Sequence, residues 1–194
     1  MLGGSWVSGI NLYATVGFLG LFSRIGWLSL PENLQMLAHP AVFITALVLY
    51  LVEFIADKVP IFDSVWDGVH TFIRVPAGAI LAWGSVGGAQ DELKVMAALL
   101  GGGIAFSSHA TKASLRALVN TSPEPFSNWA LSLAEDALVI LCLWLMLDHP
   151  YIMLTILLLF LIFFIWFIPK IFRLFRAMFR RFINLFRKKE APAH

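Results

Sequence analysis

Acidic residues stand inside stretches of the chain that are otherwise apolar. Glu53 and Asp57 end one apolar run, and Glu135 and Asp136 interrupt the run 129–147. A charged side chain at the centre of a bilayer costs roughly 2.5–3.5 kcal/mol on insertion scales, so such residues need a compensating role. The chemistry open to them is the binding of an ion, the transfer of a proton or the capture of a polar substrate.

Further polar residues share helix faces with these carboxylates. Residues three or four apart lie on one face of a helix, and four apolar stretches each carry such a face. We expect the faces to meet in a hydrated substrate or ion pathway, because exposure to lipid would be costly. The pathway residues are Asn11, Tyr13, Thr15, Glu53, Asp57, His109, Lys112, Arg116, Asn128, Glu135 and Asp136. The alternative is that opposite charges only neutralise one another and hold helices together.

The stretch 57–74 offers a second chemistry, the binding of a divalent metal. Carboxylates and one imidazole suit Mg²⁺, Mn²⁺ or Zn²⁺, as in a membrane enzyme that acts on a lipid or prenyl substrate. The ligands would be Glu53, Asp57, Asp63, Asp67 and His70. Their spacing matches no diagnostic catalytic motif, so we assign no catalytic residue and no resident cofactor. We expect a short amphipathic helix at the cytoplasmic surface, with Asp67 paired to Arg74 or His70 and directed away from the polar interior.

The elements that must position these residues are membrane spans. The chain has 194 residues, of which 59% are hydrophobic and 13% charged. About 20 residues are needed for a helix to cross a bilayer, so the pattern predicts an all-α polytopic membrane protein with about six transmembrane helices. These lie at 5–22, 37–56, 75–89, 93–108, 129–147 and 150–168. Residues 1–168 would form a single transmembrane domain.

Two of the runs, 75–89 and 93–108, are short and rich in glycine. Small residues allow close approach of helix backbones, which favours tightly packed spans. Broken or re-entrant segments that line a cavity would also contain such residues. The sequence leaves both arrangements open.

Basic residues are distributed asymmetrically along the chain. Eight of the 14 Lys and Arg residues lie in 170–189. With Lys58, Arg74, Lys112 and Arg116, twelve would lie on the cytoplasmic side, against Arg24 and Lys94 outside. By the positive-inside rule, we expect a multi-pass protein of the bacterial cytoplasmic (inner) membrane with both termini in the cytoplasm.

The segment 169–194 is predicted to form a basic amphipathic helix and tail. Phenylalanines recur at spacings of three and four over 172–186, with arginines mostly between them. Such a helix lies in the membrane interface and attracts anionic lipids of the inner leaflet. Phenylalanine beside a span favours lipid over nucleic acid as the partner, and we expect no nucleic-acid binding.

Weak internal symmetry is also visible. INLYAT (10–15) resembles FSSHAT (106–111), and a proline and then a glutamate follow each. Spans one to three would then match spans four to six as inverted repeats, an arrangement known from secondary transporters. A competing match pairs HPAVFIT (39–45) with HPYIMLT (149–155).

Four longer strings carry a resemblance to a known family. They are GINLYATV (9–16), EFIADKVPIFDSVWDGVHTFIRVPAGA (53–79), SHATKASLRALVN (108–120) and SPEPFSNWALSLAED (122–136). In this order they resemble the bacterial membrane-protein family catalogued as domain-of-unknown-function family 4126, over about residues 5–168. The resemblance implies membrane location and names no reaction.

The residues therefore favour a small secondary transporter, channel or lipid flippase with a polar intramembrane site. The substrate would be a small solute or a lipid, and a homo-oligomer is compatible with the pattern. The alternatives are the metal-dependent enzyme and a structural or assembly protein of the membrane.

Overall fold

A computed structural model describes residues 2–120 and 126–189, and every regular element in these ranges is helical. The side chains of 60, 61, 175, 178, 179 and 181–189 are outside the description. The elements are α1 (Leu2–Ile10), α2 (Leu12–Arg24), the 3-10 helix η1 (Glu32–Ala38), α3 (Pro40–Ala56), α4 (Pro60–Ser85), α5 (Asp91–Val119), α6 (Phe126–Asp148) and α7 (Pro150–Lys189).

Three of these helices are long and apolar enough to cross a membrane. They are α5, α6 and the part of α7 from Pro150 to Leu174, and η1 with α3 gives a fourth if this pair, bent by 64°, counts as one span. The 26 residues of α4 rise about 39 Å at 1.5 Å per residue, which also exceeds a bilayer core. It is not counted among these spans, because its buried charged residues lower its mean hydropathy.

The first apolar run is not one span. It divides at Asn11 into α1 of nine residues and α2 of 13, and each is too short to cross a bilayer. Asn11 has an extended backbone (φ −145°, ψ 102°), and its side-chain oxygen accepts a hydrogen bond from the Ala14 amide at 2.9 Å. This is the N-cap of α2, since Asn can satisfy an amide that has no helical partner.

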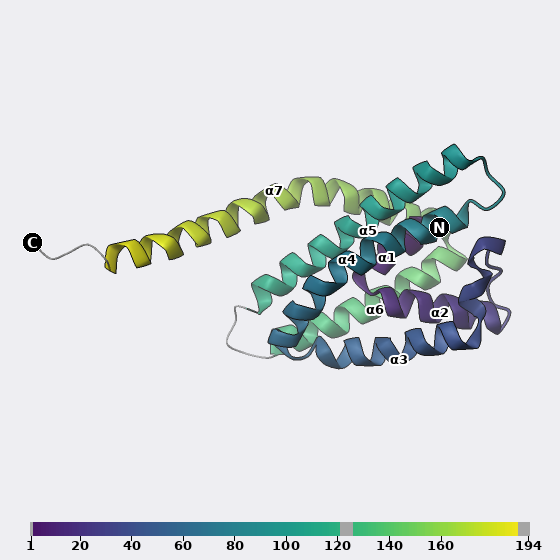
Figure 1. Cartoon of the computed structure of the whole chain (residues 1–194), viewed down its shortest axis with the longest axis horizontal. Coiled ribbons are helices and arrows are strands. Elements are labelled where there is room, and N and C mark those ends of the chain that lie inside the picture. The colour runs from purple at the N-terminus through teal and green to yellow at the C-terminus, as the bar shows by residue number, and fades with distance from the viewer. Residues whose placement is uncertain (1, 121–125, 190–194) are drawn as a thin grey trace, which may run out of the picture.

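The two half-helices form a re-entrant pair, because their outer ends lie at the same end of the bundle (Figure 1). Leu2 lines a shallow cavity with Ala82 of α4. Beyond α2, Leu30 packs against Leu81 of the same helix. The expectation of six full spans is therefore wrong for the first one, because a capping asparagine turns the chain back inside the bundle.

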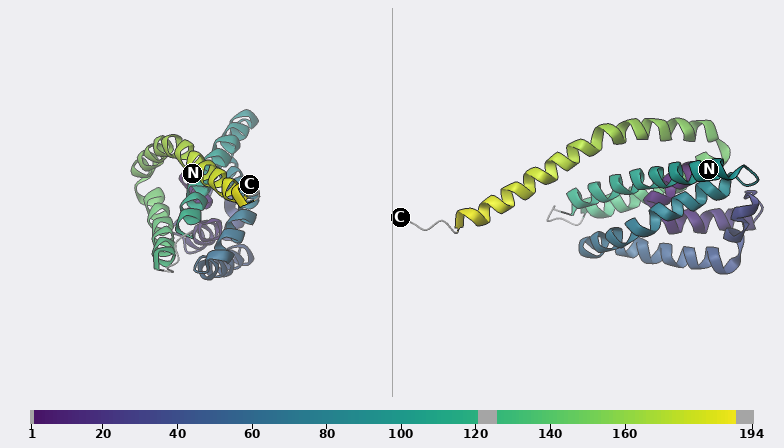
Figure 2. Two further views of the ribbon diagram at one scale, coloured as in Figure 1. Left: turned by 90° about the vertical axis from the view of Figure 1, so that its left-hand side faces the viewer. Right: turned by 45° about the horizontal axis from the view of Figure 1, so that its top comes forward.

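Helices α3 to α7 run in alternating directions between the two ends of the bundle (Figure 1, Figure 2). With a re-entrant α1–α2 pair, Leu2 and the end of α7 at Lys189 lie at opposite ends of the molecule. The expectation that both termini lie in the cytoplasm is therefore not confirmed. The physical reason is the break at Asn11, because it returns α2 to the end of the bundle where α1 begins.

The acidic and basic stripe of 57–74 is not on a surface helix. It belongs to α4, which continues to Ser85 through Pro76. Asp63, Asp67 and Arg74 are buried, because charged partners on α3 and α5 face them across the interior. The expectation of a separate amphipathic helix at the cytoplasmic surface is therefore wrong.

Neither glycine-rich run contains a re-entrant break. Residues 75–85 belong to α4 and residues 93–108 belong to α5, and both helices are tightly packed. A Cβ atom at Gly101 of α5 would overlap the Cβ of Ala82 in α4, and one at Gly78 would overlap Ala105. Small residues thus bring α4 and α5 into close contact.

The inverted repeat is not confirmed. The 29-residue α5 is unbroken, whereas its expected counterpart is the pair α1–α2, divided at Asn11. The two halves therefore differ in their first element.

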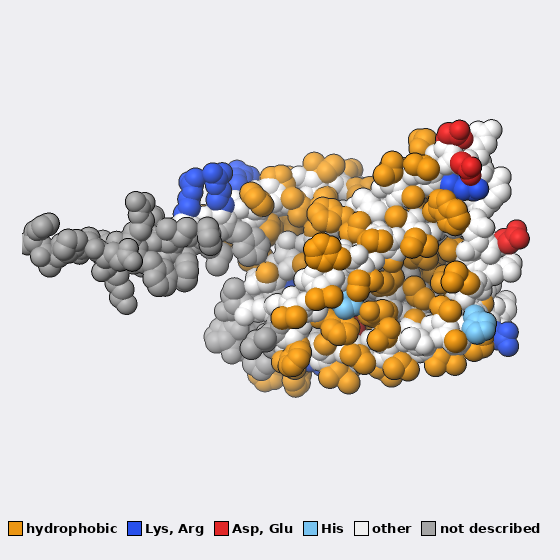
Figure 3. Space-filling view, viewed as in Figure 1, with side chains coloured by type: hydrophobic (Ala, Val, Ile, Leu, Met, Phe, Trp, Pro, Cys, Tyr) orange, Lys and Arg blue, Asp and Glu red, His pale blue; other side chains and the backbone are white. Residues whose placement is uncertain are grey.

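The last helix leaves the bundle. α7 continues as one helix through Pro169 (Figure 2), so the tail is not separated from the last span. Lys170, Arg173 and Arg176 are exposed, and residues 190–194 lie outside the described part. Apolar side chains cover the visible outer face of the bundle (Figure 3), as a lipid-facing surface requires.

Candidate functional site

Charged and polar side chains from α3, α4, α5 and α6 meet inside the bundle. All are buried except Glu135, whose side chain is 12% exposed. The set comprises Glu53, Asp57, Asp63, Asp67, His70, Arg74, His109, Lys112, Arg116, Asn128 and Glu135. We call it the ion network. It contains seven of the eleven predicted pathway residues and all five of the alternative metal ligands.

Arg74 joins α4 to α3, α1 and α5. Its Nη2 donates to Glu53 Oε1 at 2.5 Å, and Nη1 donates to Asp67 Oδ1 at 3.2 Å. Nη1 also lies 3.4 Å from the backbone oxygen of Gly9 and 3.0 Å from His109 Nδ1. The expected pairing of Asp67 with Arg74 is thus confirmed, whereas its expected outward direction is wrong.

Lys112 occupies the centre of the network. Its Nζ lies 3.2 Å from Asp57 Oδ2 and 3.5 Å from both Glu53 Oε1 and Glu135 Oε2. It also donates to the backbone oxygen of Ile10 at 3.2 Å. One ammonium therefore joins α5 to α1, α3, α6 and the α3–α4 connection.

Arg116 binds α6 and the α3–α4 connection. Its Nη2 lies 2.6 Å from Glu135 Oε2 and 3.0 Å from Asp57 Oδ2. Nη1 donates to Asn128 Oδ1 at 2.8 Å and to the backbone oxygen of Asp57 at 2.9 Å. The forked guanidinium geometry suits such multiple contacts, and the sequence-based pairing of Glu135 with Lys112 or Arg116 is confirmed.

The two histidines at the network have defined tautomers. A guanidinium only donates, so His109 Nδ1 accepts from Arg74 and Nε2 carries the proton toward Thr71 Oγ1 at 2.7 Å. His70 Nδ1 faces the Trp66 carbonyl at 2.7 Å and must donate, which leaves Nε2 to accept from Tyr13 at 2.9 Å.

Four of the predicted pathway residues lie outside the ion network. Tyr13 contacts His70, and Thr15 donates to the backbone oxygen of Asn11 at 2.7 Å. Asp136 hydrogen-bonds with Tyr50. Asn11 acts on the network through the backbone, because it interrupts the helix beside it.

No group of three or more His, Cys, Asp and Glu side chains in the described residues could hold a metal ion. The proposed ligands Glu53, Asp57, Asp63 and Asp67 face arginine or lysine in ion pairs instead.

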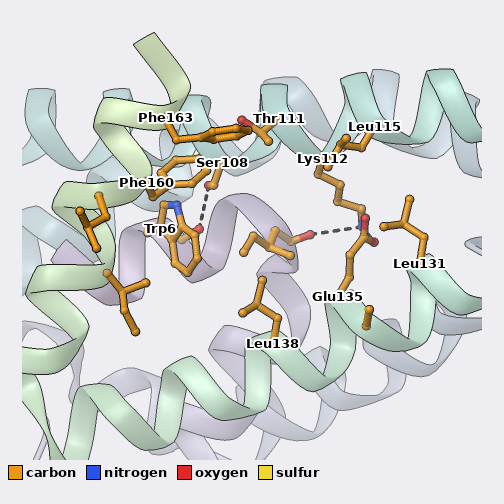
Figure 4. A pocket seen from close by; sticks show the side chains of 14 residues that line it. Trp6, Ser108, Thr111, Lys112, Leu115, Leu131, Glu135, Leu138, Phe160 and Phe163 are labelled. Carbon is orange, nitrogen blue, oxygen red and sulfur yellow. Dashed lines mark hydrogen bonds and ion pairs between the residues drawn. The ribbon is translucent and has the colours of Figure 1, made fainter. Parts of the chain in front are cut away.

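A cavity of about 510 Å³ opens between α1, α5, α6 and α7. Its walls are mostly apolar, and Lys112 and Glu135 lie at one end while Trp6, Phe160 and Phe163 lie at the other (Figure 4). A smaller cavity of about 200 Å³ between α4 and α5 reaches Asp67 and Arg116. The network thus has two openings.

The sequence correctly predicts that Asp63, Asp67, His70 and Arg74 share one helix face. The prediction that this face is exposed to water is wrong, because all four side chains are buried. The part played by the backbone oxygens of Gly9 and Ile10 could not be predicted, because the spacing of side chains says nothing about which backbone groups lack a helical partner. The available signal was Asn11, a capping residue in the middle of an apolar run.

Outside the α-helices, burial lowers the pKa of Lys58, which lies in the connection from α3 to α4. Its Nζ donates to the backbone oxygen of Phe54 at 2.8 Å and lies over the Phe54 ring. The Trp129 indole donates to the Lys58 carbonyl at 3.3 Å. This connection is therefore tied to α6 beside the network.

Comparison with curated proteins and with solved structures gives no match. The family described as Domain of unknown function (DUF4126) matches residues 1–170, which contain the re-entrant pair, the ion network and both cavities. On this match the chain belongs to the DUF4126 family.

Proposed function

We propose that the protein is a small secondary transporter in which a proton or a monovalent cation is exchanged at the ion network. The observation that carries this proposal is the meeting of the broken first helix with Arg74 and Lys112. Discontinuous helices whose free ends bind ions inside the membrane are a recurring device of secondary transporters. Irregular backbone at such depth is tolerated where it is buried in protein or lines a cavity.

The free end of α1 supplies backbone oxygens to this site. In an unbroken helix the Ala14 amide would bond to the Ile10 oxygen, but here it donates to Asn11 Oδ1. The Ile10 oxygen therefore accepts from Lys112 Nζ. The carboxyl end of a helix carries partial negative charge, so this end favours a cation.

Negative charge exceeds positive charge in the network. Ion pairs join five carboxylates, those of Glu53, Asp57, Asp63, Asp67 and Glu135, to three cations. With every group ionised, five negative and three positive charges leave two negative charges in excess. Buried charge without a partner is costly, so protons or a bound cation complete the network in this account.

Glu135 is the residue that exchanges. Its side chain is 12% exposed, against 5% or less for the other four carboxylates. A proton that arrives on Glu135 weakens its pairs with Arg116 and Lys112. Lys112 then keeps Glu53 and Asp57 as partners, and Arg116 keeps Asp57 and Asp63. This loss of the contacts with α6 couples proton entry to a shift of α6 against α5.

The orientation follows from the positive-inside rule. Eight Lys and Arg residues in 170–189 assign the end of α7 to the cytoplasm of a bacterium, and the re-entrant α1–α2 pair then assigns Leu2 to the outer side. The cytoplasmic membrane is the location that this asymmetry implies.

The test measures charge movement by the protein in liposomes on a solid-supported membrane, after separate jumps of pH, Na⁺ and K⁺. We expect a transient current with at least one of these cations and its loss in Lys112→Met. Lys94→Met is the matched control, because Lys94 pairs only with the exposed Asp91 among the described residues. Wild-type currents equal to those of protein-free liposomes for all three cations would overturn the proposal.

A further inference from the structure

The cavity between α1, α5, α6 and α7 has the size and lining of a site for an amphiphile. Its volume of about 510 Å³ falls in the range of roughly 300–1,000 Å³ that small-molecule sites occupy. Apolar side chains form most of the wall, among them Leu115, Leu131, Leu138, Ile156, Leu159 and Phe163. Such a wall fits a hydrocarbon chain.

One end of this cavity is charged, and Figure 4 shows Lys112 and Glu135 there. The Lys112 side chain is only 3% exposed and already faces four oxygens. Glu135 is the more open of the two at 12%. The head group of a molecule in the cavity would therefore contact the Glu135 carboxylate. This carboxylate belongs to a network with an excess of negative charge.

The opposite end carries a hydrogen-bond donor that lacks an acceptor in the described structure. Trp6 is buried, and its indole Nε1 has no partner among the described residues. A buried donor without a partner costs about 1–3 kcal/mol. The Trp6 ring meets the Phe160 ring edge to face, with 5.0 Å between the ring centroids, so these two aromatic rings close this end of the cavity with an apolar wall.

We propose that this cavity binds a single-chain amphiphile with a protonated amine as its head group, which donates to Glu135 while the chain lies along α5, α6 and α7. An ammonium complements the excess carboxylates, whereas a phosphate or sulfate head would be repelled by them. Such an amphiphile would be the substrate of the proposed transporter. Only its movement across the membrane rests on the proposed function, whereas its binding does not.

The test measures binding of radiolabelled dodecylammonium to the protein in phosphatidylcholine nanodiscs. We expect saturable binding that dodecylammonium itself displaces, while butylammonium and dodecyl sulfate do not. Glu135→Gln should weaken binding about tenfold, as loss of a hydrogen bond to a charged group does. Glu92→Gln, on the exposed start of α5, should bind as wild type does.

A second pair of variants tests where the hydrocarbon chain of the ligand lies. Ala134→Trp fills the cavity and should abolish binding, whereas Leu141→Trp on the exposed face of the same helix should leave it intact. Lysophosphatidylethanolamine should compete less well than dodecylammonium does, because its phosphate would be repelled by the excess carboxylates. Equal displacement by dodecyl sulfate, or wild-type affinity in both Ala134→Trp and Glu135→Gln, would overturn the inference. Saturable binding without any cation current would retain the site and remove the transport proposal.

Discussion

Lys112 Nζ lies 3.2 Å from the backbone oxygen of Ile10, across a distance of 102 residues in sequence. The contact exists because Asn11 takes the Ala14 amide and frees that oxygen. A break in one helix thereby becomes part of the ion network centred on another. The following expectations depend on this arrangement.

The cap at Asn11 can be removed without altering any charge. Asn11→Ala should destabilise the protein by about 1 kcal/mol, the usual cost of losing an N-cap, because the Ala14 amide loses its side-chain acceptor. Chemical unfolding in detergent micelles measures this. Asn11→Ser keeps a capping oxygen and should remain near wild type, so an equal loss in Ser and Ala variants would contradict the role of the cap.

Arg74 compensates two buried carboxylates. Arg74→Met should cost about 3–5 kcal/mol, because removal of one partner leaves buried charge behind. The double variant Arg74→Met with Glu53→Gln should recover part of that loss, since the 2.5 Å pair is then removed on both sides. Arg24→Met, at an exposed position, is the control. A double variant less stable than Arg74→Met would contradict the pairing.

Two glycines of α5 provide a matched test of helix packing. Gly101→Ala should destabilise the protein by about 1–3 kcal/mol, because the new methyl group overlaps Ala82 and overpacks the contact. Gly103→Ala meets no atom within 4 Å and should be stabilising by up to about 1 kcal/mol, since alanine favours a helix. Thermal unfolding of both variants in one detergent compares them. Equal effects would mean that α4 and α5 are not in close contact at Gly101.

The re-entrant pair predicts which side of the membrane each terminus faces. A cysteine tag added before Met1 should react with an impermeant thiol reagent from the same side as Gln90→Cys, and Ala177→Cys should react from the other side. All are made in a Cys142→Ser background, because Cys142 is the single cysteine. A tag that reacts together with Ala177→Cys would indicate six full spans instead.

Much of the fold could be predicted from the sequence. Run lengths gave an all-helical bundle of membrane-spanning character, and helical spacing grouped Asp63, Asp67 and Arg74 on one face. Helical spacing does not reveal which elements pack against a face, however, so the sequence predicted that this face is exposed to water. Its true partners, Glu53 and Arg116, lie on other helices, and only the packing of α3 and α5 against α4 brings them within reach.

The break at Asn11 was missed for a different reason. Hydropathy over 5–22 is high on both sides of this residue, so a composition argument counts one span. The local cap and the close approach of Gly9 to Ala105 decide otherwise. The cavity likewise depends on how α7 stands away from α5 and α6, which no pattern within one helix reveals.

The central claim is that Glu135 exchanges a proton or cation with the network and that this exchange moves charge. The most direct measurement is the transient current of reconstituted protein after a jump of the coupling cation, compared between Glu135→Gln and Glu92→Gln. The account predicts that Glu135→Gln abolishes the current while the folded protein is retained, and that Glu92→Gln keeps the wild-type current. A wild-type current in folded Glu135→Gln would contradict it.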